Sequence, residues 1–125
     1  MKRDMELLRK ILIAIEEQSD GTWIDNLQID GYNDRQIAYH CKLLYDGGYI
    51  SDCKIQYADD DMSFFGVGRL TWDGHEFLDK VKSETVWNRT KDIIVKGGLP
   101  VAIDVIKGVT SGVVEGMVKA AMNKM

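Results

Sequence analysis

Cysteine, proline and long apolar runs are scarce in this chain of 125 residues. Two cysteines, Cys41 and Cys53, are too few for a disulfide scaffold and favour a reducing compartment. One proline and twelve glycines, without a repeat, exclude collagen-like and low-complexity classes. The first six residues are mostly charged and lack the apolar run of a secretory signal. We therefore expect a cytoplasmic protein with a single core.

Basic residues are outnumbered by acidic ones. The chain has 16 Lys and Arg against 20 Asp and Glu, a net charge of −4, which argues against a general nucleic-acid-coating protein. The acidity is concentrated in residues 20–61, where three basic side chains face nine aspartates. Three of these aspartates, Asp59, Asp60 and Asp61, are consecutive. Any function that we consider must therefore account for the negative charge of this third of the chain.

The first third of the sequence predicts two helices. Asp4 is placed to cap an amphipathic helix that ends at residues 18–21. Residues 22–32 are short and mixed, and are compatible with either a strand or a single helical turn. Asn33 then caps a helix from Asp34 to about Asp46, which Gly47-Gly48 terminates.

The middle of the chain predicts a β-hairpin. Polar and apolar residues alternate over 49–57, the three consecutive aspartates form a turn, and residues 64–70 return as a second strand. Thr71 caps the next helix, whose inward residues are Phe77, Leu78 and Val81. Near Ser83 this helix either breaks or continues into residues 86–94.

Residues 97–100, Gly-Gly-Leu-Pro, form the clearest boundary. Beyond them, residues 101–122 predict an amphipathic helix long enough to span a bilayer, but the charges recurring along it argue against a membrane span. Helix, connector, helix, hairpin and helix is the order of a winged helix-turn-helix domain. We therefore predict a mainly helical α+β fold: a winged-helix domain over residues 1–96 with a two-stranded wing, then a glycine-containing linker and C-terminal amphipathic helix over residues 97–125.

Residues 37–44 with the following Gly48-Tyr49-Ile50 resemble the recognition helix and next strand of bacterial winged-helix repressors, including the arsenic-repressor type. The sequence departs from that type in two respects. Only residues 24–32 are available for the helix that precedes the recognition helix, and no cysteine pair occupies the metal-binding position of that type.

A longer resemblance covers about the first three quarters of the chain. It is carried by the opening residues 1–12, Gly31-Tyr32, residues 37–40, and above all residues 69–78 (RLTWDGHEFL) with residues 85–88 (TVWN). These resemble domain-of-unknown-function family 2513. The resemblance implies a small, cytoplasmic, often phage-encoded, winged-helix-like protein, and it brings no biochemical activity with it.

The predicted fold makes double-stranded DNA the first candidate partner. Arginine, glutamine and lysine carry donors for base edges and phosphates, and a tyrosine can contact a sugar. The candidate DNA-binding residues are Arg35, Gln36, Tyr39, Lys42, Lys54 and Arg69. The three aspartates at the predicted wing tip oppose this function, because they repel phosphate.

The alternative is a protein-interaction module whose acidic face meets a basic partner, such as a host protein, without binding DNA. The two hypotheses predict different surfaces. DNA binding requires the basic candidates to gather on one exposed face with the aspartates elsewhere, whereas protein binding allows Asp34, Asp46 or Asp52 to neutralise them.

The C-terminal helix has an apolar face that must be buried, either on its own domain or against a second copy. Glycines at every fourth position, 108, 112 and 116, would permit close helix–helix approach. We expect a homodimer through this helix. The predicted interface residues are Ile106, Val109, Val113 and Met117.

No residue pattern predicts catalysis, a metal or a cofactor. The histidines and cysteines lack the short spacing of a zinc knuckle, and adjacent His40 and Cys41 point about 100° apart on a helix. His75 has acidic neighbours, but all belong to one helix start and no nucleophile accompanies them. We therefore expect a protein that is not an enzyme.

Overall fold

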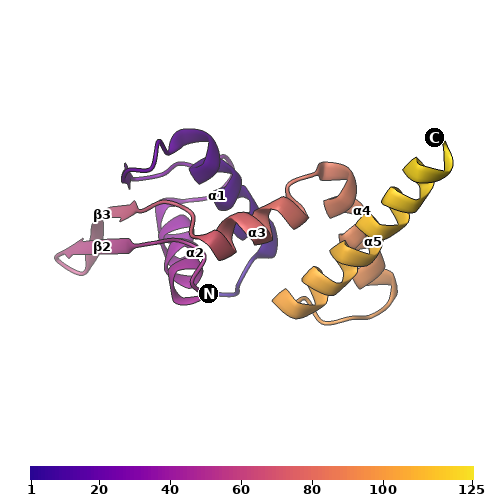
Figure 1. The fold of residues 1–125 in the computed structure, drawn as a ribbon. Coiled ribbons are helices and arrows are strands. Elements are labelled where there is room, and N and C mark those ends of the chain that lie inside the picture. Colours follow the sequence, from indigo (N-terminus) through magenta and orange to yellow (C-terminus); the bar gives the residue numbers. More distant parts are fainter. The chain divides into compact units, whose positions relative to one another are not determined.

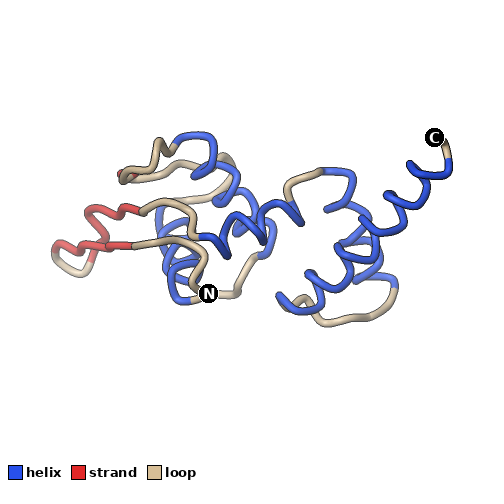
Figure 2. The backbone as a smooth tube through the Cα atoms, viewed as in Figure 1, coloured by secondary structure: helices blue, strands red, loops and turns tan.

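Five helices and three short strands make up the α+β, mainly helical fold, which the computed structural model describes over all residues 1–125 (Figures 1 and 2). The elements are α1 (Met5–Gln18), β1 (Ile24–Asp25), α2 (Asp34–Asp46), β2 (Cys53–Ala58), β3 (Asp61–Val67), α3 (Trp72–Val81), α4 (Glu84–Lys96) and α5 (Ile103–Asn123). No helix combines the length and the apolar character that crossing a membrane requires.

Helix α1 begins where the sequence predicts. The Asp4 carboxylate accepts hydrogen bonds from the backbone N–H groups of Glu6 and Leu7, two of the donors that a helix start leaves unpaired. The helix buries one apolar face in the core of the first part of the chain. That face consists of Met5, Leu7, Leu8, Ile11, Leu12, Ala14 and Ile15.

Residues 22–32, for which the sequence left two alternatives, contain a strand of two residues followed by a loop. β1 pairs with β3 in the register Ile24↔Val67. Helix α2 then starts with a capping box in which Asn33 and Gln36 exchange side-chain-to-backbone hydrogen bonds. It ends at Asp46 with Gly47 as its C-cap, and Gly48 follows with φ +83°, a conformation that glycine adopts without strain.

The hairpin of β2 and β3 is part of a three-stranded antiparallel sheet with the order β1-β3-β2. The predicted two-stranded wing therefore gains a third strand, because Ile24 and Asp25 pair with the outer side of β3. The first predicted strand also begins late, at Cys53, since Tyr49 to Asp52 form only an isolated bridge and irregular bonds. Asp59 and Asp60 form the turn with φ of +51° and +67°.

The Thr71 hydroxyl oxygen accepts the Gly74 N–H and caps α3, as predicted. Phe77, Leu78 and Val81 are all buried, which confirms them as inward positions. The open question near Ser83 is answered by a break, because the Ser83 hydroxyl caps a separate helix α4.

The chain divides into two compact units, Met1–Leu78 and Asp79–Met125, with the division inside α3. In the second unit α4 packs on α5, and the buried residues of α5 are Ile106 and Thr110. The C-terminal third of α5 is exposed. The domain boundary that we predict after residue 96 remains a prediction.

Candidate binding groove

A groove of about 750 Å³ lies in the first unit, between α2 and the β2–β3 hairpin. In Figure 1 this hairpin projects beyond the helices of its unit. The groove has mostly apolar walls with polar groups at intervals, which is the usual composition of a ligand site of this size. Its lining residues are Met1, Arg35, Ala38, Tyr39, Lys42, Cys53, Lys54, Ile55, Gln56, Tyr57, Asp60 and Met62.

Four of the six predicted DNA-binding residues line this groove: Arg35, Tyr39, Lys42 and Lys54. Gln36 does not, because its side-chain oxygen accepts the Asn33 N–H in the capping box. The sequence contains the signal for this role, a glutamine three residues after an N-cap asparagine.

Arg69 lies outside the groove. Its guanidinium donates to the Leu70 carbonyl oxygen at 3.1 Å and lines a different hollow beside His75. His75 itself lies 3.9 Å from a carboxylate oxygen of Glu16 at an exposed position. Arg69 therefore contributes no charge to the α2–β2 groove.

Carboxylates partner two of the three cations in the groove. Arg35 donates to Asp61 at 2.7 Å, and Lys42 lies 3.3 Å from Asp46, with its ammonium 4.8 Å from the centre of the Tyr45 ring. Lys54 forms no ion pair. Both ion pairs are exposed, so each contributes only about 0–1 kcal/mol and can exchange for another anion.

The two cysteines have different surroundings. Cys41 is fully buried in α2, where it packs as a small apolar residue, and burial raises the pKa of its thiol. Cys53 lines the groove half-buried, and burial raises the pKa of its thiol to about 11. Neither thiol is therefore a reactive nucleophile at neutral pH.

His40 has a structural role that the sequence does not reveal. Its buried ring lies between the first residues of α1 and the body of α2: Nε2 accepts the Asp4 N–H at 2.8 Å, and Nδ1 lies 2.7 Å from the Gln36 carbonyl oxygen. A ring nitrogen that accepts leaves the other to donate, so the ring is neutral with its proton on Nδ1. His40 thus links the start of α1 to α2, and α2 forms one wall of the groove.

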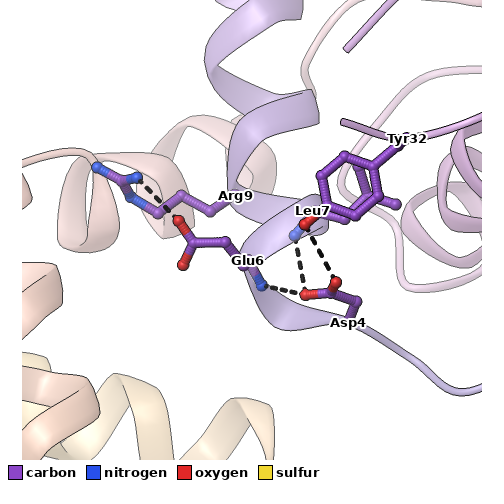
Figure 3. A network of polar contacts seen from close by, with 5 residues as sticks. All are labelled: Asp4, Glu6, Leu7, Arg9 and Tyr32. Atoms are coloured by element: carbon purple, nitrogen blue, oxygen red, sulfur yellow. Dashed lines mark hydrogen bonds and ion pairs between the residues drawn. The ribbon is translucent and has the colours of Figure 1, made fainter. Parts of the chain in front are cut away.

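Further polar contacts lie around Asp4, at the start of α1 (Figure 3). The Tyr32 hydroxyl donates to the Asp4 carboxylate at 3.2 Å, and burial together with the nearby negative charge raises the pKa of Tyr32. One turn further on, the buried Arg9 guanidinium lies 3.8 Å from Glu6. The hydrogen bond from Tyr32 to Asp4 anchors the loop before α2 to the start of α1.

The predicted dimer residues lie along α5 at different depths. Ile106 is fully buried, Val109 and Val113 are half-buried, and Met117 is 38% exposed. Of the four, Ile106 is already covered within the chain.

No group of three or more His, Cys, Asp and Glu side chains is placed to hold a metal ion.

The chain is thus a small, mainly helical α+β protein, with a groove beside a short sheet that is lined by both polar and apolar side chains. The model of the family described as "Hypothetical protein (DUF2513)" matches residues 2–100, and the chain belongs to that family. This confirms the resemblance seen in the sequence.

A curated relative supports the same assignment. The chain is 37% identical over 120 residues to an uncharacterized protein of Haemophilus influenzae, covering 94% of this chain and 98% of the relative. No solved structure matches the chain.

Proposed function

We propose that this is a non-catalytic, cytoplasmic binding protein of winged-helix type whose α2–β2 groove holds a segment of a protein partner. The observation that carries the proposal is the state of the groove's charges. Two of its three cations are paired with aspartates, while Tyr39, Ile55 and Met62 offer apolar contact. A surface with balanced charge around an apolar floor suits a protein ligand better than a polyanion.

The acidic hairpin tip supports the same choice. Asp59, Asp60 and Asp61 stand beside the groove, and Asp60 lines it. A phosphate backbone docked along α2 would approach these carboxylates, and the repulsion would oppose the release of counterions that gives DNA binding its affinity. A protein partner can meet the same carboxylates with basic side chains of its own.

Double-stranded DNA is the second candidate, because one observation favours it. Arg35, Tyr39 and Lys42 follow each other at spacings of four and three on α2, and Lys54 faces the same groove. This is the placement that a recognition helix beside a wing requires. The ion pairs of Arg35 and Lys42 would then have to open toward phosphate.

One experiment separates the two functions. The full-length protein is used to select binders from a displayed library of random dodecapeptides, and fluorescence anisotropy compares a selected peptide with a random 20-base-pair duplex at low and physiological salt. The variants are Tyr39→Ala and Lys54→Glu in the groove, with Lys124→Glu at the far end of the chain as the charge-matched control.

We expect selected peptides to bind at physiological salt, to lose affinity with both groove variants, and to be unaffected by the control. Strong, salt-sensitive duplex binding that Lys54→Glu abolishes would instead establish DNA as the ligand. Failure to select any peptide that depends on the groove would reject the protein-binding function.

We also propose that the protein forms a homodimer through the outer part of α5, where Val113 and Met117 remain accessible. Exposed apolar side chains in a helical row are stabilised by burial against a second copy. Sedimentation equilibrium tests this directly: a dimer that Met117→Lys converts to a monomer is expected, and a monomer in the unaltered protein would reject it.

A further inference from the structure

The backbone edge of β2 opens into the groove. The sheet order β1-β3-β2 leaves β2 with a partner on one side only. Five consecutive residues of this strand, from Cys53 to Tyr57, line the groove. Side chains of a strand alternate between its two faces, so a consecutive run lines one groove when the strand's edge faces it. The groove is therefore bounded on one side by main-chain donors and acceptors.

Three hydrogen bonds show which residues of β2 turn their backbone groups outward. The Gly68 N–H donates to the Asp52 carbonyl, so Asp52 faces β3, whereas the Cys53 N–H donates to its neighbour's carboxylate at 2.8 Å. On the opposite side of β3, the Asn26 N–H donates to the Phe65 carbonyl. Phe65 thus faces β1.

The register then assigns the outward groups on β2. In an antiparallel ladder the directions alternate, and Phe65, which faces β1, pairs with Ile55. The N–H and C=O of Ile55 therefore point away from β3 into the groove, as those of Cys53 do, while Lys54 bonds within the ladder. A bulge between Gln56 and Tyr57 ends the regular edge. The available edge runs from Cys53 to Gln56.

Building on the proposed function, we propose that the partner's segment is extended, carries a carboxylate side chain opposite Lys54, and adds as a further strand to the edge of β2, in the groove beside α2. Strand addition satisfies the outward N–H and C=O groups of Ile55, which the sheet leaves without a strand partner. The register of such a strand is set by main-chain bonds, and its side chains then determine which sequences fit.

Charge complementarity argues for a carboxylate at one position of the segment. Two of the three cations that line the groove, Arg35 and Lys42, are already paired with Asp61 and Asp46, and Asp60 adds a carboxylate to the lining. Lys54 belongs to the edge strand itself and has no ion-pair partner, so it is placed to meet a carboxylate of an added strand.

The opposite wall favours alternate apolar residues in the same segment. Ala38 is buried in α2 and Tyr39 is 40% exposed beside it, and Ile55 lies half-buried on the strand. An added strand turns every second side chain to one face, so apolar residues can meet this wall while a carboxylate on the other face meets Lys54. The segment that fits therefore has β-branched residues at alternate positions and a glutamate opposite Lys54.

The test uses the full-length protein and an acetylated nonapeptide that alternates threonine and valine, with glutamate in place of the central threonine. Backbone amide exchange of the protein is followed by NMR with and without millimolar peptide. We expect the Ile55 amide to exchange about tenfold more slowly with peptide, because its N–H gains a partner. The Lys54 amide, which already bonds to β3, is the internal control and stays unchanged.

Two N-methylated forms of the peptide, methylated either at the valines or at the residues between them, test the main-chain bonds. We expect one form alone to lose about tenfold or more in affinity, since only one edge of the added strand faces β2. Lys54→Glu should weaken the unmethylated peptide, and Lys124→Glu should not.

Each other outcome overturns strand addition by such a segment. Equal binding of both methylated forms, or an unprotected Ile55 amide in the bound state, would show that side chains alone hold the peptide. Protection of Ile55 that depends on protein concentration without peptide would identify a second copy as the occupant. No binding of this peptide, while peptides from the random library still bind the groove, would reject the inference and leave the proposed function standing.

Discussion

Replacing His40 with alanine should destabilise the first unit strongly. The His40 ring is 2% exposed and joins two segments 36 residues apart through its bond to the Asp4 N–H. His40→Ala leaves that partly buried donor without its acceptor, at a cost of about 1–2 kcal/mol, and it empties the space of the ring. The sum is a loss of about 2–4 kcal/mol in the free energy of unfolding.

Urea denaturation followed by circular dichroism measures this loss. With an ordinary dependence of stability on urea, the midpoint should fall by about 1–2 M. His75→Ala is the matched control, because that histidine is half-exposed and its 3.9 Å contact with Glu16 contributes little. It should shift the free energy of unfolding by no more than about 0.5 kcal/mol.

Equal urea midpoints for His40→Ala and His75→Ala would refute the stabilising role of the link that His40 makes between α1 and α2. A small effect of His40→Ala would mean that water or another group satisfies the Asp4 N–H once the ring is removed. The start of α1 would then not depend on its link to α2, and one wall of the groove would be held by apolar packing alone.

Three further predictions follow from local geometry. Gly74→Ala should lower the melting temperature, because a Cβ there would overlap the Tyr49 carbonyl oxygen. Gly112→Ala, with open space around it, should raise the free energy of unfolding by about 0.5–1 kcal/mol, and a loss would contradict this. Thr90→Val should raise the melting temperature, with a gain of about 1 kcal/mol in the free energy of unfolding, because it removes a buried hydroxyl without a hydrogen-bond partner. A lower melting temperature would contradict this. Cys53 should react with a disulfide reagent at pH 8 about one hundredfold more slowly than a thiol of pKa 9, and its rate should rise with pH up to about 11; a rate already saturated at pH 8 would contradict the raised pKa.

Local signals explain what the sequence predicts well. Asp4, Asn33 and Thr71 are helix caps in the structure because each bonds to backbone groups within three residues of itself. The hairpin turn at Asp59 and Asp60 is equally local.

Contacts between distant segments explain what the sequence does not predict. β1 has only two residues, and its existence depends on pairing with β3 about forty residues later. The partner of Arg35 is Asp61, 26 residues away, so helix spacing places Arg35 on the right face without revealing that its charge is neutralised. The groove itself arises only when the fold brings α2 and β2 together, and no sequence pattern in either segment predicts it.

The claim that the α2–β2 groove binds a protein segment, and not DNA, is tested most directly by one anisotropy titration at physiological salt. A groove-selected peptide and a random duplex are titrated in parallel against the unaltered protein and Lys54→Glu. The account predicts that the peptide binds, that the duplex does not, and that Lys54→Glu weakens the binding of the peptide. Tight duplex binding that Lys54→Glu abolishes, with no peptide that depends on the groove, would contradict the account.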